Sequence, residues 1–505
     1  MSNPASTSSL KQPVVILWIQ QCLRIDDNPA IDTALSFGLP ILPVFCLEDL
    51  NRDQTWHVGG ASKWWLHHSL KHLQDSYHQL DAGLVLFSGR FEEALSPLKT
   101  HFEIKAIVTD ERWEPSARHH ISQLKAELSS AGIQFQPVNT HLCFHPNALS
   151  TQQETPFKVF TPFWKKALEM GVNLSLTDPS KQQAHLKDSL IEQQSVSNII
   201  SSVSLDDLGL LPQIPWDAGF YPEWTPGEKG AKQALNRFIL EALQNYHTDR
   251  DRPDKAGTSR LSPHLHFGEI SPFRIWQELS ALTPVIFKGN SPSTHYLREI
   301  AWREFAHHLL VHFPHTPLQP LRPEFEQFPW QENETHLTAW KKGLTGYPIV
   351  DAGMRELWAT GWMHNRVRMI VASFLVKHLL LPWQEGAHWF WDTLVDADLP
   401  NNTLGWQWSA GCGADAAPYF RIFNPILQGL KFDTEGAYIR RWIPELRELD
   451  TRYIHTPWET PPGFLTLAQI KLGEDYPYPI VDHQEARQKA LKAFETLKGL
   501  KVQTV

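Results

Sequence analysis

Cysteine is scarce in this sequence, with four residues among 505. Cys22, Cys46, Cys143 and Cys412 lie far apart and show none of the paired spacings of a disulfide framework or a cysteine zinc site. We therefore expect reduced thiols, a cytoplasmic location and no bound metal.

Long hydrophobic runs are also missing. The first apolar stretch, residues 14–19, is far too short to span a bilayer. The preceding residues 1–13 are polar, without the basic flank or the cleavage pattern of a targeting signal. The sequence thus predicts neither a membrane span nor export.

An excess of positive charge is absent too, because the formal net charge is −9. This balance argues weakly against a nucleic-acid partner, since phosphate binding requires cations. One basic face would be enough, however, and residues 421–442 hold four basic side chains against two acidic ones. Charge therefore leaves that partner open. The 21 tryptophans are more informative, because some of them are available for stacking or electron transfer beyond the needs of a core.

Strand and helix signals alternate through the first quarter of the chain. Apolar, β-rich runs occupy residues 14–19, 41–46, 84–87 and 106–108, with helical patterns between them, as at residues 61–80. The first helix is marked by Asn28 as N-cap, Pro29 at its first position and Gly38 at its end. This alternation predicts a doubly wound parallel sheet in an α/β domain, residues 13–140. No Gly-x-Gly-x-x-Gly motif follows the first strand, so the usual dinucleotide site is not indicated.

The remaining sequence divides into a connector and a helical domain. Residues 141–215 are mixed and rich in serine and glutamine, which favours a long inter-domain connector. Helical periodicity then dominates, in residues 231–246, 296–312, 349–381 and 484–497. We predict an all-α domain at residues 216–498 and hence a fold of the α/β plus all-α class.

Two motifs combine groups that suit an anionic or planar ligand. Gly257-Thr258-Ser259-Arg260-Leu261-Ser262 places small hydroxyl residues before a helix, which suits a pyrophosphate but is also an ordinary N-cap. On another predicted helix, Glu299, Trp302 and Arg303 share one face. They would hydrogen-bond and stack a planar ring, or form a surface ion-pair face around a half-buried tryptophan.

Two further motifs bring polar groups to an apolar helix. Asn365 and Met369 face the same way, as do His364 and Arg368. Polar groups buried there require partners, and Asp396 and Asp398 are the natural candidates. The Asp-x-Asp-x-x-Asn pattern that these two acids begin also resembles a calcium loop, but it lacks the later glycine and the terminal glutamate.

In this order, the motifs resemble those of the photolyase/cryptochrome family, nearest to its bacterial cyclobutane pyrimidine dimer DNA photolyases. The resemblance extends from about residue 14 to about residue 498 and includes residues 17–24, 157–163 and 415–425. It implies an N-terminal antenna domain and a helical domain that holds FAD. The positions that match flavin contacts are Tyr246, Thr258, Ser259, Arg260, Leu261, Ser262, Tyr296, Arg303, Arg368, Asp396, Ala397, Asp398 and Asn402.

The resemblance also implies roles in the chemistry. Catalytic positions are matched by Glu299, Asn402, Trp302 and Met369, and Asn402 is an amide where plant cryptochromes carry an acid. Electron transfer to the flavin is implied for Trp406, Trp383 and Trp330. The positions that match DNA contacts are Arg250, Trp302, Asn365, Arg366, Met369, Trp408, Arg421 and Gln428. Relatives that repair (6-4) photoproducts carry paired histidines at His364-Asn365, so cyclobutane dimers are the favoured substrate.

The antenna chromophore is where this chain departs most from the family pattern. Members that clamp methenyltetrahydrofolate with a Cys-Lys pair carry it where this sequence has Pro317-Leu318, whereas Glu114 matches a folate contact. We expect methenyltetrahydrofolate before deazaflavin, and an empty antenna site is the third alternative.

The implied function is light-driven repair of damaged DNA by a monomeric deoxyribodipyrimidine photo-lyase. The dimer is flipped out of the duplex, light excites reduced FAD, and one electron passes to the dimer and returns after the ring splits. Glu299, if protonated, would donate a hydrogen bond to the dimer. The chief alternative is a cryptochrome-type blue-light photoreceptor, which often carries a long C-terminal extension that we do not expect here. A light-independent flavoprotein oxidoreductase is a more distant alternative.

Overall fold

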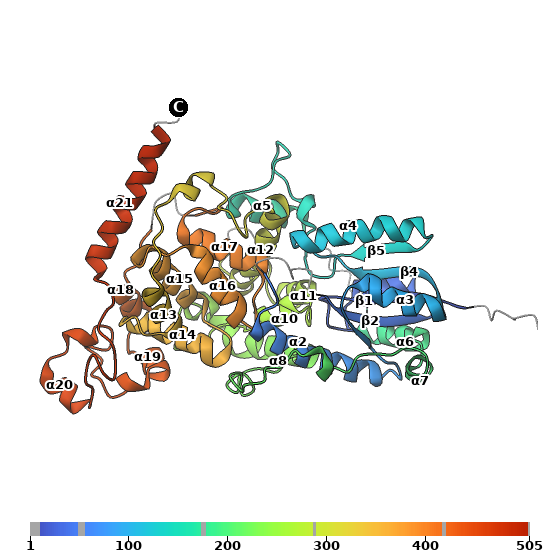
Figure 1. The fold of residues 1–505 in the computed structure, drawn as a ribbon, viewed down its shortest axis with the longest axis horizontal. Coiled ribbons are helices and arrows are strands. Elements are labelled where there is room, and N and C mark those ends of the chain that lie inside the picture. The colour runs from blue at the N-terminus through green and yellow to red at the C-terminus, as the bar shows by residue number, and fades with distance from the viewer. Residues whose placement is uncertain (1–10, 49–55, 173–177, 286–288, 417–420, 503–505) are drawn as a thin grey trace, which may run out of the picture.

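The computed structural model describes residues 11–48, 56–172, 178–285, 289–416 and 421–502. An α/β domain forms one end of the elongated molecule and a larger helical body forms the other (Figure 1). The predicted α/β plus all-α class is thus confirmed. No described helix is both long enough and apolar enough to cross a membrane.

The α/β domain is built on five parallel strands in the order β3-β2-β1-β4-β5. Their bounds are β1 (Gln12–Ile19), β2 (Ile41–Leu47), β3 (Val85–Ser88), β4 (Phe102–Asp110) and β5 (Gln134–Val138). In β1, residues 14–19 are buried on both faces of the sheet, which explains their continuous apolar sequence. The predicted runs do not include β5, because Pro137 and two glutamines weaken its β signal.

Helices cover both faces of the sheet. One face carries α1 (Pro29–Leu35), α2 (Gly60–His78) and α6 (Pro179–Ser189), and the other carries α3 (Phe91–His101) and α4 (Pro115–Ser130). The predicted cap of α1 is confirmed, since the Asn28 side chain accepts a hydrogen bond from Ala30 N. The helix ends at Leu35, three residues before Gly38, which has a positive φ of 62°.

Asp110, the last residue of β4, closes the point where ligands usually bind a doubly wound sheet. Its Oδ2 accepts hydrogen bonds from the backbone N–H groups of Gln20, Gln21 and Cys22, at 3.2, 2.6 and 2.6 Å. These three residues follow β1, the neighbour of β4 in the sheet. The protein's own carboxylate therefore takes the donors that a phosphate would use, in agreement with the missing glycine motif.

The predicted connector contains more structure than its composition indicates. It includes α5 (Phe160–Met170), α6 and α7 (Gln193–Ser197). α5 packs against the helical body, whereas α6 returns to α1, where Gln182 donates to the Asn28 carbonyl at 3.1 Å. The chain thus crosses to the helical body and back. The domain limits at residues 140 and 215 remain predictions.

The helical body includes the long helix α12, most of whose side chains are buried. Its helices are α8 (Glu228–Arg237), α9 (Tyr246–Asp249), α10 (Ser262–His266), α11 (Pro272–Leu282), α12 (Pro292–His312), α13 (Glu334–Lys342), α14 (Pro348–Thr360), α15 (Asn365–Ser373), α16 (Trp383–Thr393), α17 (Leu399–Ala410), α18 (Pro425–Phe432), α19 (Ala437–Trp442), α20 (Pro462–Leu467) and α21 (His483–Val502). The continuous periodicity predicted at residues 349–381 is wrong, because Gly361 ends α14 with a φ of 68° and His364 caps α15.

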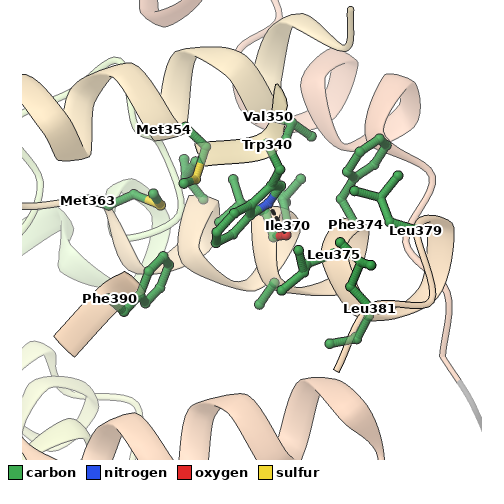
Figure 2. Packing of buried hydrophobic residues seen from close by; sticks show 14 of the residues in the cluster. Trp340, Val350, Met354, Met363, Ile370, Phe374, Leu375, Leu379, Leu381 and Phe390 are labelled. Atoms are coloured by element: carbon green, nitrogen blue, oxygen red, sulfur yellow. Dashed lines mark hydrogen bonds between the residues drawn. The ribbon is translucent and has the colours of Figure 1, made fainter. Parts of the chain in front are cut away.

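The main core of the helical body packs around Trp340 of α13 (Figure 2). Its indole is fully buried and donates to the Val371 carbonyl of α15 at 3.0 Å. Trp340 also meets Trp406 of α17 edge-on, with ring centroids 6.1 Å apart. This core fixes the positions of α15, α16 and α17, which carry part of the candidate site.

Gly386 lets α16 approach α17, and replacing it should disturb the core. A Cβ at this position would lie 2.0 Å from the Trp406 ring. We expect Gly386→Ala to lower the free energy of unfolding by about 1–3 kcal/mol through overpacking, as measured by urea denaturation. The matched control is Gly405→Ala in α17, where a Cβ would meet nothing within 4 Å and should stabilise by about 0.5–1 kcal/mol. Equal stability of the two variants would contradict this account of the packing.

Candidate functional site

The three residues predicted to share a face of α12 have separate partners. Glu299 accepts a hydrogen bond from Arg250 at 2.6 Å. Trp302 stacks on Phe160 of α5, with ring centroids 3.8 Å apart and planes within 8°. Arg303 is buried and donates to the His141 carbonyl at 2.7 Å. This face of α12 is therefore neither a purely solvent-exposed ion-pair face nor a set of groups around one planar ring. Through Trp302 and Arg303 it packs the connector against the helical body.

The loop at residues 257–262 is held by a side chain of α12. The Tyr296 hydroxyl donates to Ser259 Oγ at 2.8 Å, and Leu261 N donates to the same oxygen at 3.2 Å. Tyr246 packs edge-on against Tyr296, at 5.3 Å between ring centroids. Ser262 begins α10, which is only five residues long. The helix dipole expected here is consequently small, so side-chain hydroxyls and N–H groups dominate this end of the site.

Arg260 leaves the loop in a left-handed conformation, with φ of 53°. Its guanidinium pairs with Glu223 at 2.8 Å and lies over the rings of Trp224 and Trp362, at 4.2 and 5.0 Å. Its Nε is buried and has no hydrogen-bond partner among the described residues, and the same is true of His364 Nε2. Such donors are the kind of group that a bound polar ligand satisfies.

The predicted ion pair between Arg368 and Asp396 is confirmed. Nη2 of Arg368 lies 3.1 and 2.9 Å from the two carboxylate oxygens, and its Nε donates to the Met363 carbonyl at 2.7 Å. The Asp396 side chain is 3% exposed and that of Arg368 is 23% exposed. The pair thus presents a fixed positive and a fixed negative group at the junction of α15 and the segment before α17.

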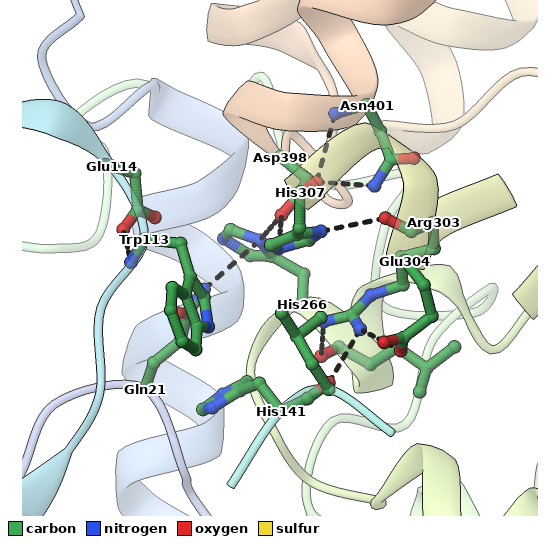
Figure 3. A network of polar contacts seen from close by, with 12 residues as sticks. Gln21, Trp113, Glu114, His141, His266, Arg303, Glu304, His307, Asp398 and Asn401 are labelled. Carbon is green, nitrogen blue, oxygen red and sulfur yellow. Dashed lines mark hydrogen bonds and ion pairs between the residues drawn. The ribbon is translucent and has the colours of Figure 1, made fainter. Parts of the chain in front are cut away.

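The prediction that Asp398 pairs with the polar groups at the start of α15 is wrong, because its partners lie on other helices. Its Oδ2 caps α17 by accepting from Asn401 N at 3.2 Å, while its Oδ1 lies 3.2 Å from His266 Nδ1 and 4.0 Å from His307 Nε2 (Figure 3). Burial raises the pKa of Asp398, but His307, the hydrogen bond from His266 and the charge of Arg303 outweigh burial and hold the pKa well below its usual range. Asp398 is therefore a buried anion that joins three elements.

Asn402 lies one turn into α17, and its side-chain amide donates to the Ala387 carbonyl of α16 at 3.0 Å. Ala397 is buried between the two acids. Trp406 and Trp383 are each 2% exposed and Trp330 is half-buried, all against the core of Figure 2. Of these three tryptophans, only Trp330 is partly exposed, as the outer end of a path from an inner site to the surface would be.

The candidate DNA contacts lie mainly around α15 and α17. Arg366 pairs with Asp251 at 2.8 Å and approaches Met369 Sδ at 3.7 Å, just as Arg250 pairs with Glu299. Asn365 and Arg421 are exposed, and Gln428 is half-buried in α18. Trp408 and Arg421 line a small pocket with Ser373, Lys377, Ser409, Gly411 and Phe423. The phosphates of bound DNA would have to replace Asp251 and Glu299 as the partners of these two arginines.

Glu114 occupies the N-cap position of α4, at the boundary of the two domains. It forms an ion pair with Arg112 at 3.1 Å. Burial raises the pKa of Glu114, but the Arg112 charge and hydrogen bond outweigh burial and lower it. Figure 3 places Glu114 beside Trp113 and across from the Asp398 cluster. Its side chain is thus already engaged, and a chromophore would have to share it.

Sequence reasoning missed three residues that shape the site. His266 follows the hydroxyl loop, His307 lies one turn after Arg303 on α12, and Phe160 stacks on Trp302. The i, i+4 spacing of Arg303 and His307 is a signal that could have identified the second of them. Nothing local marks His266 as a partner of Asp398, 132 residues away.

Two family models match this chain and identify the family to which it belongs. Residues 15–182 match the model described as DNA photolyase, and residues 296–496 match the model described as FAD binding domain of DNA photolyase. The chain belongs to the photolyase/cryptochrome family.

Individual relatives cover nearly the whole chain. A deoxyribodipyrimidine photo-lyase of Agrobacterium fabrum is 44% identical over 97% of this chain and 99% of its own length. Cryptochrome-2 of Arabidopsis thaliana is 38% identical over 95% of this chain and 78% of its own length. The crystal structure of a bacterial class III photolyase from Agrobacterium tumefaciens superposes with a TM-score of 0.89, at 43% identity, over 98% of this chain and 100% of its own.

Removing the negative partner of Arg368 should lower both the stability of the protein and its content of bound flavin. We expect Asp396→Asn to lower the free energy of unfolding by about 3 kcal/mol, at the low end for a buried pair because Arg368 keeps some solvent contact. The purified variant should carry only a small fraction of the wild-type flavin absorbance.

The control is Glu445→Gln, which removes an equivalent partner from Arg355, 2.8 Å away on a different part of the helical body. It should lower stability and leave the flavin content unchanged. Full, tightly bound flavin in Asp396→Asn would show that the pair does not hold the cofactor.

Proposed function

We propose that this protein is a light-driven DNA repair enzyme, a deoxyribodipyrimidine photo-lyase that splits cyclobutane pyrimidine dimers. The observation that carries the proposal is the buried Arg368–Asp396 pair, with the amide of Asn402 close after Asp396 in the chain, in a member of the photolyase/cryptochrome family. An amide cannot donate a proton as a carboxylic acid does. Asn402 therefore suits a flavin kept anionic and reducing.

The residues present fit FAD in the chemistry of their donors and acceptors. Hydroxyls of the 257–262 loop suit the pyrophosphate, and the Arg368–Asp396 pair suits the polar edge of the isoalloxazine. The full proposed set is Tyr246, Thr258, Ser259, Arg260, Leu261, Ser262, Tyr296, Arg303, Arg368, Asp396, Ala397, Asp398 and Asn402. Reduced FAD, when bound and illuminated, supplies the electron that repair requires.

The remaining residues act on the DNA. Trp302, Trp408, Asn365 and Met369 would line the pocket for the flipped dimer, where an aromatic ring supports a base by stacking. Arg250, Arg366 and Arg421 would contact phosphates and set the affinity for any duplex, with Gln428 beside them. Glu299 accepts a hydrogen bond from Arg250, so its proposed role as a donor to the dimer requires this ion pair to open.

We propose methenyltetrahydrofolate as the second chromophore, ahead of deazaflavin. The support is the match of Glu114 to a folate contact and its position at the domain boundary. The enzyme is proposed to act as a monomer.

The direct test uses chemically reduced, flavin-loaded protein and an oligonucleotide with a single thymine dimer. Under near-ultraviolet or blue light the dimer should be converted to two thymines, and in the dark it should persist. An oligonucleotide with a (6-4) photoproduct should remain unrepaired. Light-driven flavin chemistry without any thymine restored would favour the cryptochrome-type photoreceptor instead.

Replacing the innermost tryptophan should separate flavin reduction from repair. We expect Trp406→Phe to abolish photoreduction of oxidised flavin, because phenylalanine is far harder to oxidise than an indole. Repair by chemically reduced protein should stay within about twofold of wild type, since the repair electron does not pass through Trp406. Flavin absorbance under illumination and restored thymine measure the two activities, and a parallel loss of both would contradict separate roles.

Removing the stacking surface of Trp302 should erase discrimination between damaged and intact DNA. Base–aromatic stacking contributes about 1–3 kcal/mol, so Trp302→Ala should weaken binding of dimer-containing DNA roughly 10- to 100-fold. Intact duplex should bind as before, because phosphate contacts carry that affinity.

Trp302→Phe tests for a purely structural effect, since it keeps a ring against Phe160 and should bind damaged DNA more tightly than Trp302→Ala. Trp358→Ala removes an exposed indole and should change neither affinity. If Trp302→Ala lowers the melting temperature and both affinities together, Trp302 belongs to the core and not to the pocket.

A further inference from the structure

Three potential metal ligands meet at one side of the α/β domain, far along the chain from the flavin site. They are Glu48, directly after β2, Glu92 in the first turn of α3, and His120 in α4. One ligand atom from each lies within 4.8 Å of the other two. No sequence motif joins them, because 44 residues separate the two acids and 28 more precede the histidine.

These side chains are too buried to be an ordinary surface cluster. The side chains of Glu48 and His120 are each 6% exposed, and that of Glu92 is 28% exposed. His120 also packs edge-on against Trp18, at 6.3 Å between ring centroids, and Trp18 in turn stacks on Phe91 at 3.8 Å. The cluster therefore packs against buried aromatic side chains of β1 and α3.

The ligand atoms are only partly satisfied by protein groups. Glu48 Oε1 accepts from Phe91 N at 2.7 Å, and His120 Nε2 lies 2.8 Å from Glu92 Oε1. His120 Nδ1 is buried without a hydrogen-bond partner among the described residues, and Glu48 Oε2, at 3.8 Å, is beyond hydrogen-bond distance from it. Glu92 Oε2 is likewise buried and has no hydrogen-bond partner in the part of the chain that the structure describes.

The local charges are also unbalanced. Arg90 pairs with Glu92 at 3.2 Å, but its side chain is 61% exposed and contributes little. Arg112, the other nearby cation, is paired with Glu114. Among the residues that the structure describes, these two carboxylates and the histidine, mostly out of water, have no buried lysine or arginine of their own, and such groups are costly unless they are paired or bind a metal.

We propose that Glu48, Glu92 and His120 bind one divalent transition-metal ion of the zinc type. A nitrogen ligand beside two carboxylates favours Zn²⁺, or Mn²⁺ and its neighbours, over Mg²⁺ and Ca²⁺, which prefer oxygen ligands alone. The ion would link β2, α3 and α4 and so brace one side of the α/β domain. The absence of metal predicted from cysteine spacing does not bear on this cluster, which contains no cysteine.

The test is equilibrium dialysis of the full-length, flavin-loaded protein against Zn²⁺ after removal of metals with a chelator. Wild type should bind one equivalent more than Glu48→Gln and His120→Gln, and each variant should weaken that site roughly tenfold or more. Glu48→Gln keeps an oxygen that can accept the Phe91 N–H. Zinc should raise the melting temperature of wild type and not of these variants.

Matched controls separate this site from adventitious binding by other histidines. His119→Gln changes the exposed neighbour on α4, and Glu93→Gln changes the neighbouring acid on α3, and both should retain the extra equivalent. Equal zinc binding by wild type, Glu48→Gln and His120→Gln would overturn the proposal. A wild-type melting temperature that does not change when zinc is added would also overturn it and would identify the cluster as a hydrogen-bonded brace without metal.

Discussion

The site depends on two buried carboxylates, Asp396 and Asp398, which stand two residues apart just before α17. Asp396 holds Arg368 on α15. Asp398 holds His266 at the end of α10 and His307 on α12, and it caps α17. Four helices are thus positioned by one short segment. An unpaired buried charge is strongly destabilising. Moving any of these helices away from its carboxylate would therefore lower the stability of the fold.

The same electrostatic cluster continues into the boundary between the domains. Arg303 donates to the His141 carbonyl in the connector, and the neighbouring Glu304 accepts from Cys143 N and Phe144 N at 3.1 and 3.2 Å. Burial raises the pKa of Glu304 to about 7, although Arg303 and both N–H groups act to lower it. Figure 3 shows Glu114 and Trp113 of the α/β domain on the other side of this network. The proposed antenna and flavin sites therefore share one rigid polar boundary.

Much of this arrangement could be predicted from the sequence, for physical reasons that differ between elements. Buried parallel strands give continuous apolar runs, and the Arg368–Asp396 pair followed from the need to compensate a cation on an apolar helix. The break at Gly361 was missed because the apolar period continues on both sides of it. A glycine with a positive φ commonly ends a helix. The periodicity of apolar residues does not show which glycines adopt a positive φ.

Other features could not be predicted, because they depend on contacts between distant segments. Asp398 was assigned to the helix that begins with His364, yet it pairs with His266 and His307. The return of the connector to α1 and the stacking of Phe160 on Trp302 are also long-range. The roles of the matched residues in flavin and DNA binding still rest on the family resemblance.

The most direct test of this account is the free energy of unfolding of Asp398→Asn in urea at neutral pH. Because the pKa of Asp398 is held below its usual range, its contribution is fully present at neutral pH and is lost as the pH falls through the folded-state pKa. We predict a loss of roughly 3–5 kcal/mol at neutral pH, against almost none for the exposed Asp188→Asn. An Asp398→Asn protein as stable as wild type would contradict the claim that this buried anion holds the site together.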